Sequence, residues 1–283
     1  MIMQREMRQA VLIAMMLPQV GLAQAPAVSQ QSTPPSTMPP SVQSRMFAQS
    51  YLKPDQLPNS AVLVPPPPAS GSEAMKRDTE GATTAVAQQG GARWKLAVAD
   101  AELMAPDAIG TTFSCASGFA ISAKATPALS ALLSRAAANL AMSTMAAKRK
   151  YQRARPFMVN GKPTCTPELE AVLRKDGSYP SGHSAIGFGT GLILAEAIPS
   201  RATELVARGR VFGDSRRICN VHWLSDIEEG RFMAAATFAR LNADPAFQKD
   251  LAAARSEADA ALAANSAPGR DCVGEAGTIA ATR

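Results

Sequence analysis

The stretch PSGHSAIGFGTGLILAEA, residues 180–197, contains the longest apolar run after the N-terminal region, at residues 185–195. The turn-forming residues at its start favour a helix that begins just after Gly182 and ends before Pro199. The glycines at 187, 189 and 191 indicate a tightly packed helix, and their spacing is wrong for a dinucleotide-binding loop. Glu196 ends the apolar run well short of the roughly 20 residues that a membrane span needs, so we expect no membrane span.

Other segments also carry apolar residues at helical spacing, and no segment alternates convincingly between apolar and polar residues. Thr126 and Pro127 form a favourable helix start, with a capping hydroxyl followed by proline at the first position. We therefore predict an all-α fold with a single domain over residues 49–265 and a loop-like C-terminal tail over 266–283. The further predicted helices cover residues 94–103, 127–150, 201–211, 215–241 and 245–264.

The N-terminal residues have the pattern of a secretory signal peptide. Arg5 and Arg8 precede an apolar segment at residues 10–16, and small residues at Gly21 and Ala23 fit a cleavage site. We predict a signal peptide over residues 1–23 and a periplasmic or secreted mature protein; a buried N-terminal helix is the alternative. Residues 24–48 are rich in Pro, Ser and Gln and are predicted to form a flexible arm. By composition alone, residues 51–72, with four consecutive prolines, are a linker or a surface polyproline segment.

Composition narrows the partners only in part. The formal net charge of +6 favours anionic partners without choosing among them. Aromatic residues make up 5% of the chain and no nucleic-acid-binding signature is present, so nucleic acid is not expected as a partner.

Four cysteines in an exported chain predict two disulfides, and the sequence leaves all three pairings open. A single bridge with two free thiols stays open as well, whereas a zinc site is disfavoured because no pair has C-x-x-C spacing. The four are Cys115, Cys165, Cys219 and Cys272.

Both histidines of the chain fall in three short polar blocks. Taken singly, the blocks have ordinary interpretations: a solvated basic run, a turn followed by a helix cap, and a surface ion pair. Taken together, they supply every group that one phosphate-ester site needs. The blocks are Lys148 with Arg155 and Pro156; Pro180, Ser181, Gly182 and His183; and Ser215, Arg216, His222 and Asp226.

Phosphate-ester hydrolysis must stabilise charge spread over the phosphoryl oxygens. Lys148, Arg155 and Arg216 suit this task, and the seven-residue spacing of the first two places both on one face of a helix. Ser181 and Gly182, at a helix start, can add backbone N–H groups and a hydroxyl. These five residues are therefore predicted to bind phosphate.

The same chemistry needs a nucleophile and a proton donor. Neutral imidazole can attack phosphorus, which makes His222 the predicted nucleophile. Asp226, four residues later on the same helix face, would accept a hydrogen bond from one ring nitrogen and so fix the tautomer. His183 would then protonate the leaving alkoxide, which predicts a bell-shaped pH profile with an acidic optimum.

The three blocks match the pattern of the phosphatidic acid phosphatase type 2 (PAP2) superfamily: Lys-x6-Arg-Pro, Pro-Ser-Gly-His and Ser-Arg-x5-His-x3-Asp. Flanking segments resemble bacterial class A non-specific acid phosphatases over roughly residues 50–255, among them residues 63–68, 113–115, 173–179 and 218–223. The departures from that pattern lie outside the motif, at Ser184, Arg217 and Asn220.

The resemblance implies a helical bundle of the PAP2 and vanadium haloperoxidase type, exported, with no metal or other cofactor. It also implies that the polyproline stretch belongs to the folded domain, and it leaves a homo-oligomer open. The implied reaction is hydrolysis of phosphate monoesters, such as nucleotides, sugar phosphates and aryl phosphates, to an alcohol and inorganic phosphate. The implied route runs through a phosphohistidine and is inhibited by vanadate.

Four other functions compete with this one. Vanadate-dependent halide oxidation uses the same site pattern, but its enzymes are usually much longer chains. Lipid phosphatases typically carry several membrane spans. A non-catalytic envelope protein that binds anions would have no need for the pair His222 and Asp226, and nucleic-acid binding has no motif here.

Overall fold

The computed structural model describes residues 49–281, so the predicted signal peptide and the arm at 24–48 lie outside the described residues. Residues 49–281 form helices joined by turns and contain no strand, which confirms the predicted all-α fold. The α-helices are α2 (Ser60–Leu63), α3 (Glu73–Val86), α4 (Ala92–Ala101), α5 (Ala108–Ser117), α6 (Pro127–Met142), α7 (Met145–Tyr151), α8 (Pro156–Asn160), α9 (Glu170–Leu173), α10 (Gly182–Ala197), α11 (Ala202–Ile218), α12 (Leu224–Asn242), α13 (Pro245–Ala263) and α14 (Cys272–Ala280). Short 3-10 turns are η1 (Pro54–Gln56), η2 (Pro167–Leu169) and η3 (Pro199–Arg201).

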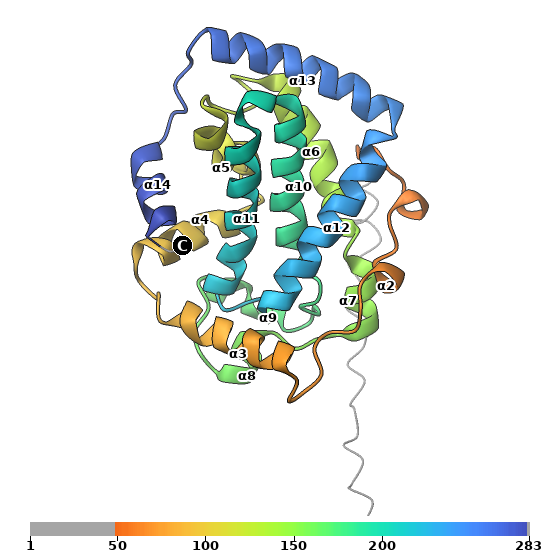
Figure 1. Ribbon diagram of the computed structural model, residues 1–283, viewed down its shortest axis with the longest axis vertical. Helices are drawn as coiled ribbons and strands as arrows, with labels where there is room; N and C mark the ends of the chain where they lie inside the picture. Colours follow the sequence, from red (N-terminus) through yellow and green to blue (C-terminus); the bar gives the residue numbers. More distant parts are fainter. Residues whose placement is uncertain (1–48, 282–283) are drawn as a thin grey trace, which may run out of the picture. The chain divides into compact units, whose positions relative to one another are not determined.

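Helix α10 lies at the centre of these helices, beside α11 and crossed by α12, with α6 behind it (Figure 1). The close approach of α10 and α11 depends on glycine. A Cβ on Gly191 would lie 2.8 Å from the Leu205 carbonyl oxygen, and one on Gly209 would lie 2.7 Å from the Gly187 carbonyl oxygen. The prediction of a tightly packed glycine-containing helix at 187–191 is therefore confirmed.

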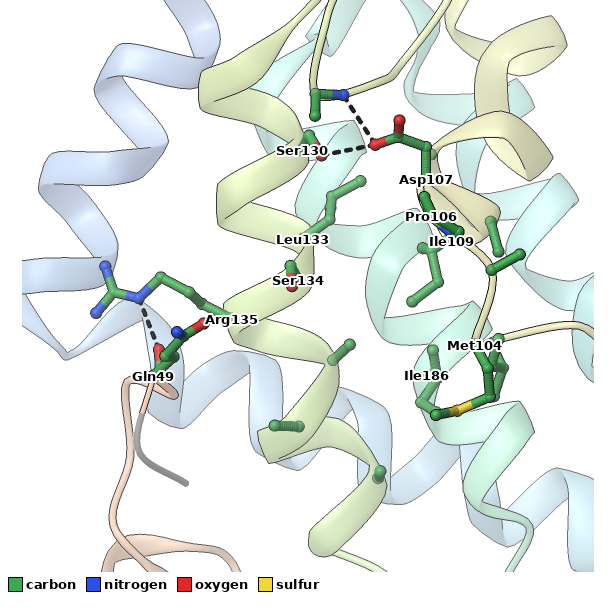
Figure 2. A pocket seen from close by; sticks show the side chains of 18 of the residues that line it. Gln49, Met104, Pro106, Asp107, Ile109, Ser130, Leu133, Ser134, Arg135 and Ile186 are labelled. Carbon is green, nitrogen blue, oxygen red and sulfur yellow. Dashed lines mark hydrogen bonds between the residues drawn. The ribbon is translucent and has the colours of Figure 1, made fainter. Parts of the chain in front are cut away.

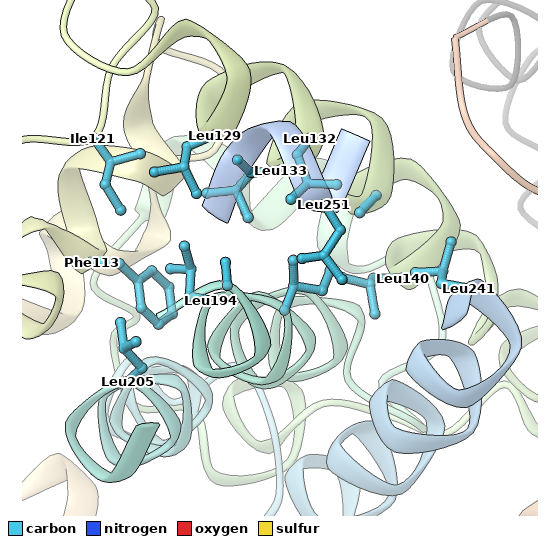
Figure 3. Close-up of a cluster of buried hydrophobic side chains, with 14 of the residues drawn as sticks. Phe113, Ile121, Leu129, Leu132, Leu133, Leu140, Leu194, Leu205, Leu241 and Leu251 are labelled. Carbon is cyan, nitrogen blue, oxygen red and sulfur yellow. The ribbon is translucent and has the colours of Figure 1, made fainter. Parts of the chain in front are cut away.

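The main hydrophobic core fills the space that α10 shares with α5, α6 and α13 (Figure 3). In Figure 3, leucines of α6 face Leu251 of α13 and Leu194 of α10, while Phe113 of α5 closes one end. All of these side chains are buried. These leucines form the apolar face by which α6 covers α10.

The helix predicted over residues 127–150 is two helices, α6 and α7. Between them the hydroxyls of Ser143 and Thr144 donate to the carbonyls of Leu140 and Ala141, each at 2.8 Å, and such bonds compete with helix continuation. The start is also capped differently from the prediction. Thr126 makes no capping hydrogen bond, and the Glu257 carboxylate of α13 accepts the first-turn N–H groups instead.

The boundary predicted between residues 211 and 215 is wrong, because α11 runs without a break to Ile218. The chain then turns through Asn220, which has a positive φ of 59°, and α12 begins only at Leu224. The Asn220 side chain holds this turn by bonding Asn160 and the backbone at Lys162. His222 therefore lies in a turn and not on a helix.

The polyproline stretch is part of the folded structure, which corrects the linker interpretation from composition and agrees with the resemblance. Tyr179 donates its hydroxyl to the Pro65 carbonyl at 3.0 Å, and Val64 is buried beside it. Just upstream, the backbone N–H groups of Tyr51 and Leu52 both donate to the buried Asn139 side chain of α6. These contacts fasten residues 51–65 to the bundle.

The C-terminal tail is not the loop expected from its sequence, since residues 272–280 form α14. A disulfide joins Cys115 of α5 to Cys272 of α14, and a second joins Cys165 to Cys219. This pairing uses all four cysteines and selects one of the three connectivities that the sequence left open. In the described part of the chain, no helix combines the length and the apolar character that crossing a bilayer requires.

Candidate active site

The three polar blocks converge where α10 starts, where α11 turns into α12, and where α7 leads into α8. The backbone N–H of Ser181 donates to the Asp226 carbonyl at 2.8 Å, which joins the start of α10 to the start of α12. The Arg155 guanidinium reaches the His222 ring at 3.1 Å, which joins the segment before α8 to the same turn. These contacts join four of the eight predicted residues, and Gly182 follows Ser181 directly. Lys148, Arg216 and His183 are close enough for their charges to act on His222 or to be acted on by it.

His222 is buried and holds hydrogen-bond partners at both ring nitrogens. Its Nδ1 lies 3.2 Å from Asp226 Oδ2, and its Nε2 lies 3.1 Å from Arg155 Nη1. Because a guanidinium can only donate, Nε2 must be the acceptor and Nδ1 carries the proton. Burial, followed by the charges of Arg155 and Lys148, lowers the pKa of His222 well below its usual range. The ring is thus neutral, with its Nε2 lone pair directed toward a cation.

Asp226 is the buried partner of that ring. Its carboxylate also accepts the Trp223 backbone N–H at 2.9 Å and Arg153 Nη1 at 2.7 Å. Burial raises the pKa of Asp226, and Arg153 opposes this rise. The predicted pairing of His222 with Asp226 is present, but the helix-face geometry behind it is wrong: Asp226 stands in the first turn of α12, and His222 precedes the N-cap Trp223.

Arg155 and Lys148 meet through a shared carboxylate rather than along one helix face. The backbone at Gln152 has a positive φ of 44°, which ends α7, so Arg155 lies outside that helix. Asp176 accepts from Lys148 Nζ at 3.2 Å and from Arg155 Nη2 at 3.1 Å. Burial lowers the pKa of Lys148 to about 8, with Asp176 opposing the shift.

Arg216 differs from the other two cations. Its side chain is 1% exposed, and its Nε and Nη1 have no hydrogen-bond partner among the described residues. Burial and the neighbouring Arg155 charge lower the pKa of Arg216 to about 9. A buried guanidinium with unpaired donors is costly, and such groups call for an anionic partner.

The start of α10 carries Ser181 as its N-cap. Its hydroxyl oxygen accepts the Ser184 N–H at 3.2 Å, which leaves the hydroxyl hydrogen available to an anion. The Ser181 backbone N–H is already bonded to Asp226, so the expectation that it faces phosphate is wrong. Gly182 is the first residue of the helix, where backbone N–H groups have no intrahelical acceptor.

His183 lies in the first turn of α10 and is partly accessible to solvent. Its Nε2 lies 3.2 Å from the Ala101 carbonyl at the end of α4, and its ring stacks on Phe212. Burial, followed by the Arg216 charge, lowers the pKa of His183 well below its usual range. The ring is therefore oriented by a backbone carbonyl and surrounded by positive charge.

Three residues at this site were missed by sequence reasoning. Asp176 belongs to the quoted flank at 173–179 but was given no role. Arg153 stands in the basic run that reads as a solvated face, yet its side chain is only 9% exposed. Asp78, in α3, offered no sequence signal at all, because it is distant in the chain and isolated from the three blocks.

A separate cavity of about 590 Å³ lies between α6 and the segment that leads into α5 (Figure 2). Its walls are mainly apolar, with Leu133, Ile109, Met104 and Ile186 among the side chains that Figure 2 labels. None of the eight predicted site residues lines it. Within residues 49–281, no group of three or more His, Cys, Asp or Glu side chains is arranged to hold a metal ion.

Comparisons with known proteins agree with the motif. The family model of the PAP2 superfamily matches residues 127–247. The non-specific acid phosphatase of Salmonella typhimurium (strain LT2) is 43% identical over 213 residues, covering 74% of this chain and 84% of that protein. An acid phosphatase of Zymomonas mobilis is 38% identical over 69% of this chain and 74% of its own length, and a non-specific acid phosphatase of Providencia stuartii is 38% identical over 73% and 84%. The chain therefore belongs to the class A non-specific acid phosphatases of the PAP2 superfamily.

Proposed function

We propose that this acid phosphatase hydrolyses phosphate monoesters through a covalent phosphohistidine on His222. The observation that carries the proposal is the pair of contacts at the His222 ring. The Asp226 carboxylate accepts a hydrogen bond from Nδ1–H of the ring. The Nε2 lone pair points at the Arg155 guanidinium, which is where a bound phosphoryl group would be held.

Phosphate would be bound by cations that the chain already holds in place. The unpaired donors of Arg216 would each take a phosphoryl oxygen, and Arg155 would contribute Nη1. Lys148 adds a third charge, while the Ser181 hydroxyl and the Gly182 N–H complete the ring of donors. These donors contact only the phosphoryl group and not the rest of the substrate. This supports a broad range of nucleotides, sugar phosphates and aryl phosphates as substrates.

In the first step, His222 Nε2 attacks phosphorus while the bond from phosphorus to the ester oxygen breaks. The phosphoryl group takes over the Arg155 hydrogen bond, so the lone pair is freed as the substrate binds. Asp226 stabilises the positive charge that develops on the ring. His183 gives its proton to the leaving oxygen, and an alcohol departs.

In the second step, water attacks the phosphohistidine. His183, now neutral, takes a proton from that water, the phosphorus–nitrogen bond breaks, and inorganic phosphate leaves. His183 must be protonated for the first step, although burial and Arg216 depress its pKa. A bound phosphate dianion would offset the Arg216 charge and raise that pKa again, and an acidic optimum follows from the residual depression.

The decisive test is to trap the intermediate. Wild-type enzyme quenched during turnover of a ³²P-labelled monoester should carry acid-labile, alkali-stable phosphate on His222. His222→Ala should carry none. His183→Asn is the matched control: with an aryl phosphate whose leaving group needs no proton, it should still be labelled but should turn over slowly. Label on the His222→Ala protein would overturn the assignment.

Metal independence and vanadate inhibition are tested separately. Activity should survive exhaustive chelation, because the three buried cations take the role that metal ions have in other phosphoryl-transfer enzymes. Vanadate should compete with substrate for the same hydrogen-bond donors. Loss of activity with chelator and its return with a divalent ion would contradict the mechanism.

An exported location is proposed on two grounds. The N-terminal pattern predicts a signal peptide, and the two disulfides are of a kind that persists in oxidising compartments. Fractionation of expressing cells should find activity outside the cytoplasm. A homo-oligomer is proposed from the resemblance alone, and light scattering of the purified protein would test it.

A further inference from the structure

The carboxylate that orients His222 is itself held by a buried ion-pair chain that the sequence motif does not include. Asp226 Oδ1 accepts Arg153 Nη1 at 2.7 Å, and Arg153 Nη2 donates to Asp78 Oδ2 at 2.6 Å. Imidazole, carboxylate, guanidinium and carboxylate thus follow one another from His222 to Asp78. The Arg153 side chain is 9% exposed, and the side chains of Asp78 and Asp226 are 2% and 0% exposed.

The two far members of the chain are fixed on several sides. Asp78 accepts both the backbone N–H and the hydroxyl of Ser225, at 2.8 and 2.6 Å, so α3 is fastened to the first turn of α12 next to Asp226. Arg153 Nη1 also reaches the Ser225 hydroxyl at 2.8 Å, and its guanidinium lies 5.3 Å from the centre of the Trp223 ring. The Arg153 carbonyl accepts the Ser178 N–H at 2.9 Å. Little freedom remains for the Arg153 side chain.

We propose that Arg153 and Asp78 are positioning residues of the reaction, which keep the Asp226 carboxylate ionised and aimed at His222. The inference rests on the proposed function of His222. Without Arg153, Asp226 would be a buried carboxylate beside another buried carboxylate, an arrangement that favours the protonated form. A protonated Asp226 could no longer act as the charged acceptor for the His222 ring.

The charge balance around His222 and Asp226 predicts the sign of each effect on the pH profile. Removing the Arg153 cation favours protonation of both groups, so the acidic limb of kcat/KM should move to higher pH. Removing the Asp78 anion leaves the Arg153 charge less compensated, so the limb should move to lower pH. The other titratable or charged groups that face the pair are Lys148 from α7, Arg155 from the segment before α8, Tyr179, His183 from α10 and Arg216 from α11.

The test compares Arg153→Met, Asp78→Asn and Arg153→Lys with wild type on one aryl phosphate, so that ionisation of the substrate is common to all. Arg153→Met should lose about 10–100-fold in kcat/KM, by analogy with the loss of a group that orients a metal-bound histidine, and its acidic limb should move to higher pH. Asp78→Asn should lose less in kcat/KM, and its acidic limb should move to lower pH. Arg153→Lys should keep the wild-type limb and recover part of the rate.

Arg77→Met is the matched structural control. Arg77 also joins α3 to α12, through Glu228 at 3.2 Å, but both side chains are exposed and far less constrained. It should leave rate and pH profile unchanged. A folded Arg153→Met enzyme that behaves like Arg77→Met would overturn the inference, as would shifts of the same sign in Arg153→Met and Asp78→Asn.

Two further outcomes are separable. Should Arg153→Met fail to fold, the contrast between a downward-shifted acidic limb in Asp78→Asn and a wild-type limb in Arg153→Lys still decides, because the first variant keeps the side-chain shape and the second keeps the charge. Failure to trap phosphate on His222 in wild type would refute the proposed function. A normal wild-type trap, together with unaltered pH limbs in the variants, would refute only the role of Arg153 and Asp78.

Discussion

Asp176 brings a carboxylate into the cluster of buried cations, where it accepts from both Lys148 and Arg155. A substrate phosphate must compete with this carboxylate for the same donors. We expect Asp176→Asn to lower KM and the inhibition constant for inorganic phosphate by roughly two- to five-fold, the size of one partly exposed ion pair. Steady-state kinetics with phosphate as inhibitor would measure both.

Glu170→Gln provides the control for that change. Glu170 lies in the same segment, has a similar side-chain exposure of 25% against 30%, and pairs with Arg174 away from the site. It should leave KM unchanged. A rise in KM for Asp176→Asn would mean that the carboxylate places Lys148 and Arg155 rather than competing with substrate.

His183 makes stability depend on pH. Burial and Arg216 lower its folded pKa, whereas the unfolded chain has the ordinary value of about 6.5. The unfolded state therefore binds more protons as pH falls through that value, and the free energy of unfolding decreases. The thermal midpoint should drop from about pH 7.5 to about pH 5.5, and drop less in His183→Asn. Equal slopes of thermal midpoint against pH in wild type and His183→Asn would contradict a depressed pKa of His183. His222 contributes a slope of the same sign to both proteins.

Spacing predicted which residues form the candidate site but not how they are held. Lys148, Arg155 and Arg216 could be predicted because they stand in short polar blocks that together match the PAP2 pattern. Arg153 and Asp78 could not, since an arginine in a basic run is ordinarily solvated and a lone aspartate in a helix carries no pattern. What distinguishes them is burial, and burial at one position depends on helices distant in sequence.

At the scale of helices, the crossing of α10 and α11 sets the distance between the two parts of the site. Helix α10 carries His183 near its start, and α11 carries Arg216 near its end. At Gly209 an added Cβ would meet the Gly187 carbonyl oxygen at 2.7 Å and Phe188 Cα at 3.1 Å, both backbone atoms. Gly209→Ala must therefore push the helices apart.

We expect Gly209→Ala to lower the free energy of unfolding by about 1–3 kcal/mol, the usual cost of overpacking. It should also reduce kcat, because Arg216 moves relative to α10. Denaturant unfolding and kinetics on the same preparation would show both effects. Gly277→Ala in α14 is the control, since nothing lies within 4 Å of its added Cβ and alanine favours helix. Unchanged stability in Gly209→Ala would show that the crossing is not closely packed.

The sequence pattern predicted α10 and α13 well, merged α6 and α7 into one helix, and misplaced the boundary between α11 and α12. The reason is local. The break predicted at residues 212–214 falls inside α11, and the actual break depends on Asn220, whose side chain bonds a distant segment at 160–163. The four-residue spacing of His222 and Asp226 fitted a helix equally well, although a turn produces the same pairing.

At the scale of the whole described chain, the disulfide between Cys115 and Cys272 fastens the C-terminal helix α14 to α5. Glu275 of α14 accepts from Arg208 at 2.9 Å, and Arg208 pairs with Asp100. Asp100 in turn accepts the hydroxyl of Ser215, the neighbour of Arg216. The C-terminal segment thus supports α11 through buried charges, and the bridge keeps that support in place.

Replacing both cysteines, in Cys115→Ala with Cys272→Ala, should lower stability more than it lowers activity. The bridge links residues 157 apart in sequence. For a loop of this length, loop-closure entropy limits the loss in free energy of unfolding to about 5 kcal/mol. Without it α14 should detach first, because Glu275 and Arg208 would then be held by charge alone. Hydrogen exchange should rise in residues 264–280 before the core, and kcat at low temperature should stay near wild type.

The bridge between Cys165 and Cys219 is the contrasting case. Cys219 is the C-cap of α11, three residues before His222, so removal of this bridge should reduce kcat as well. Equal losses of activity in the two double variants would contradict this division between a distant support and a bridge at the site.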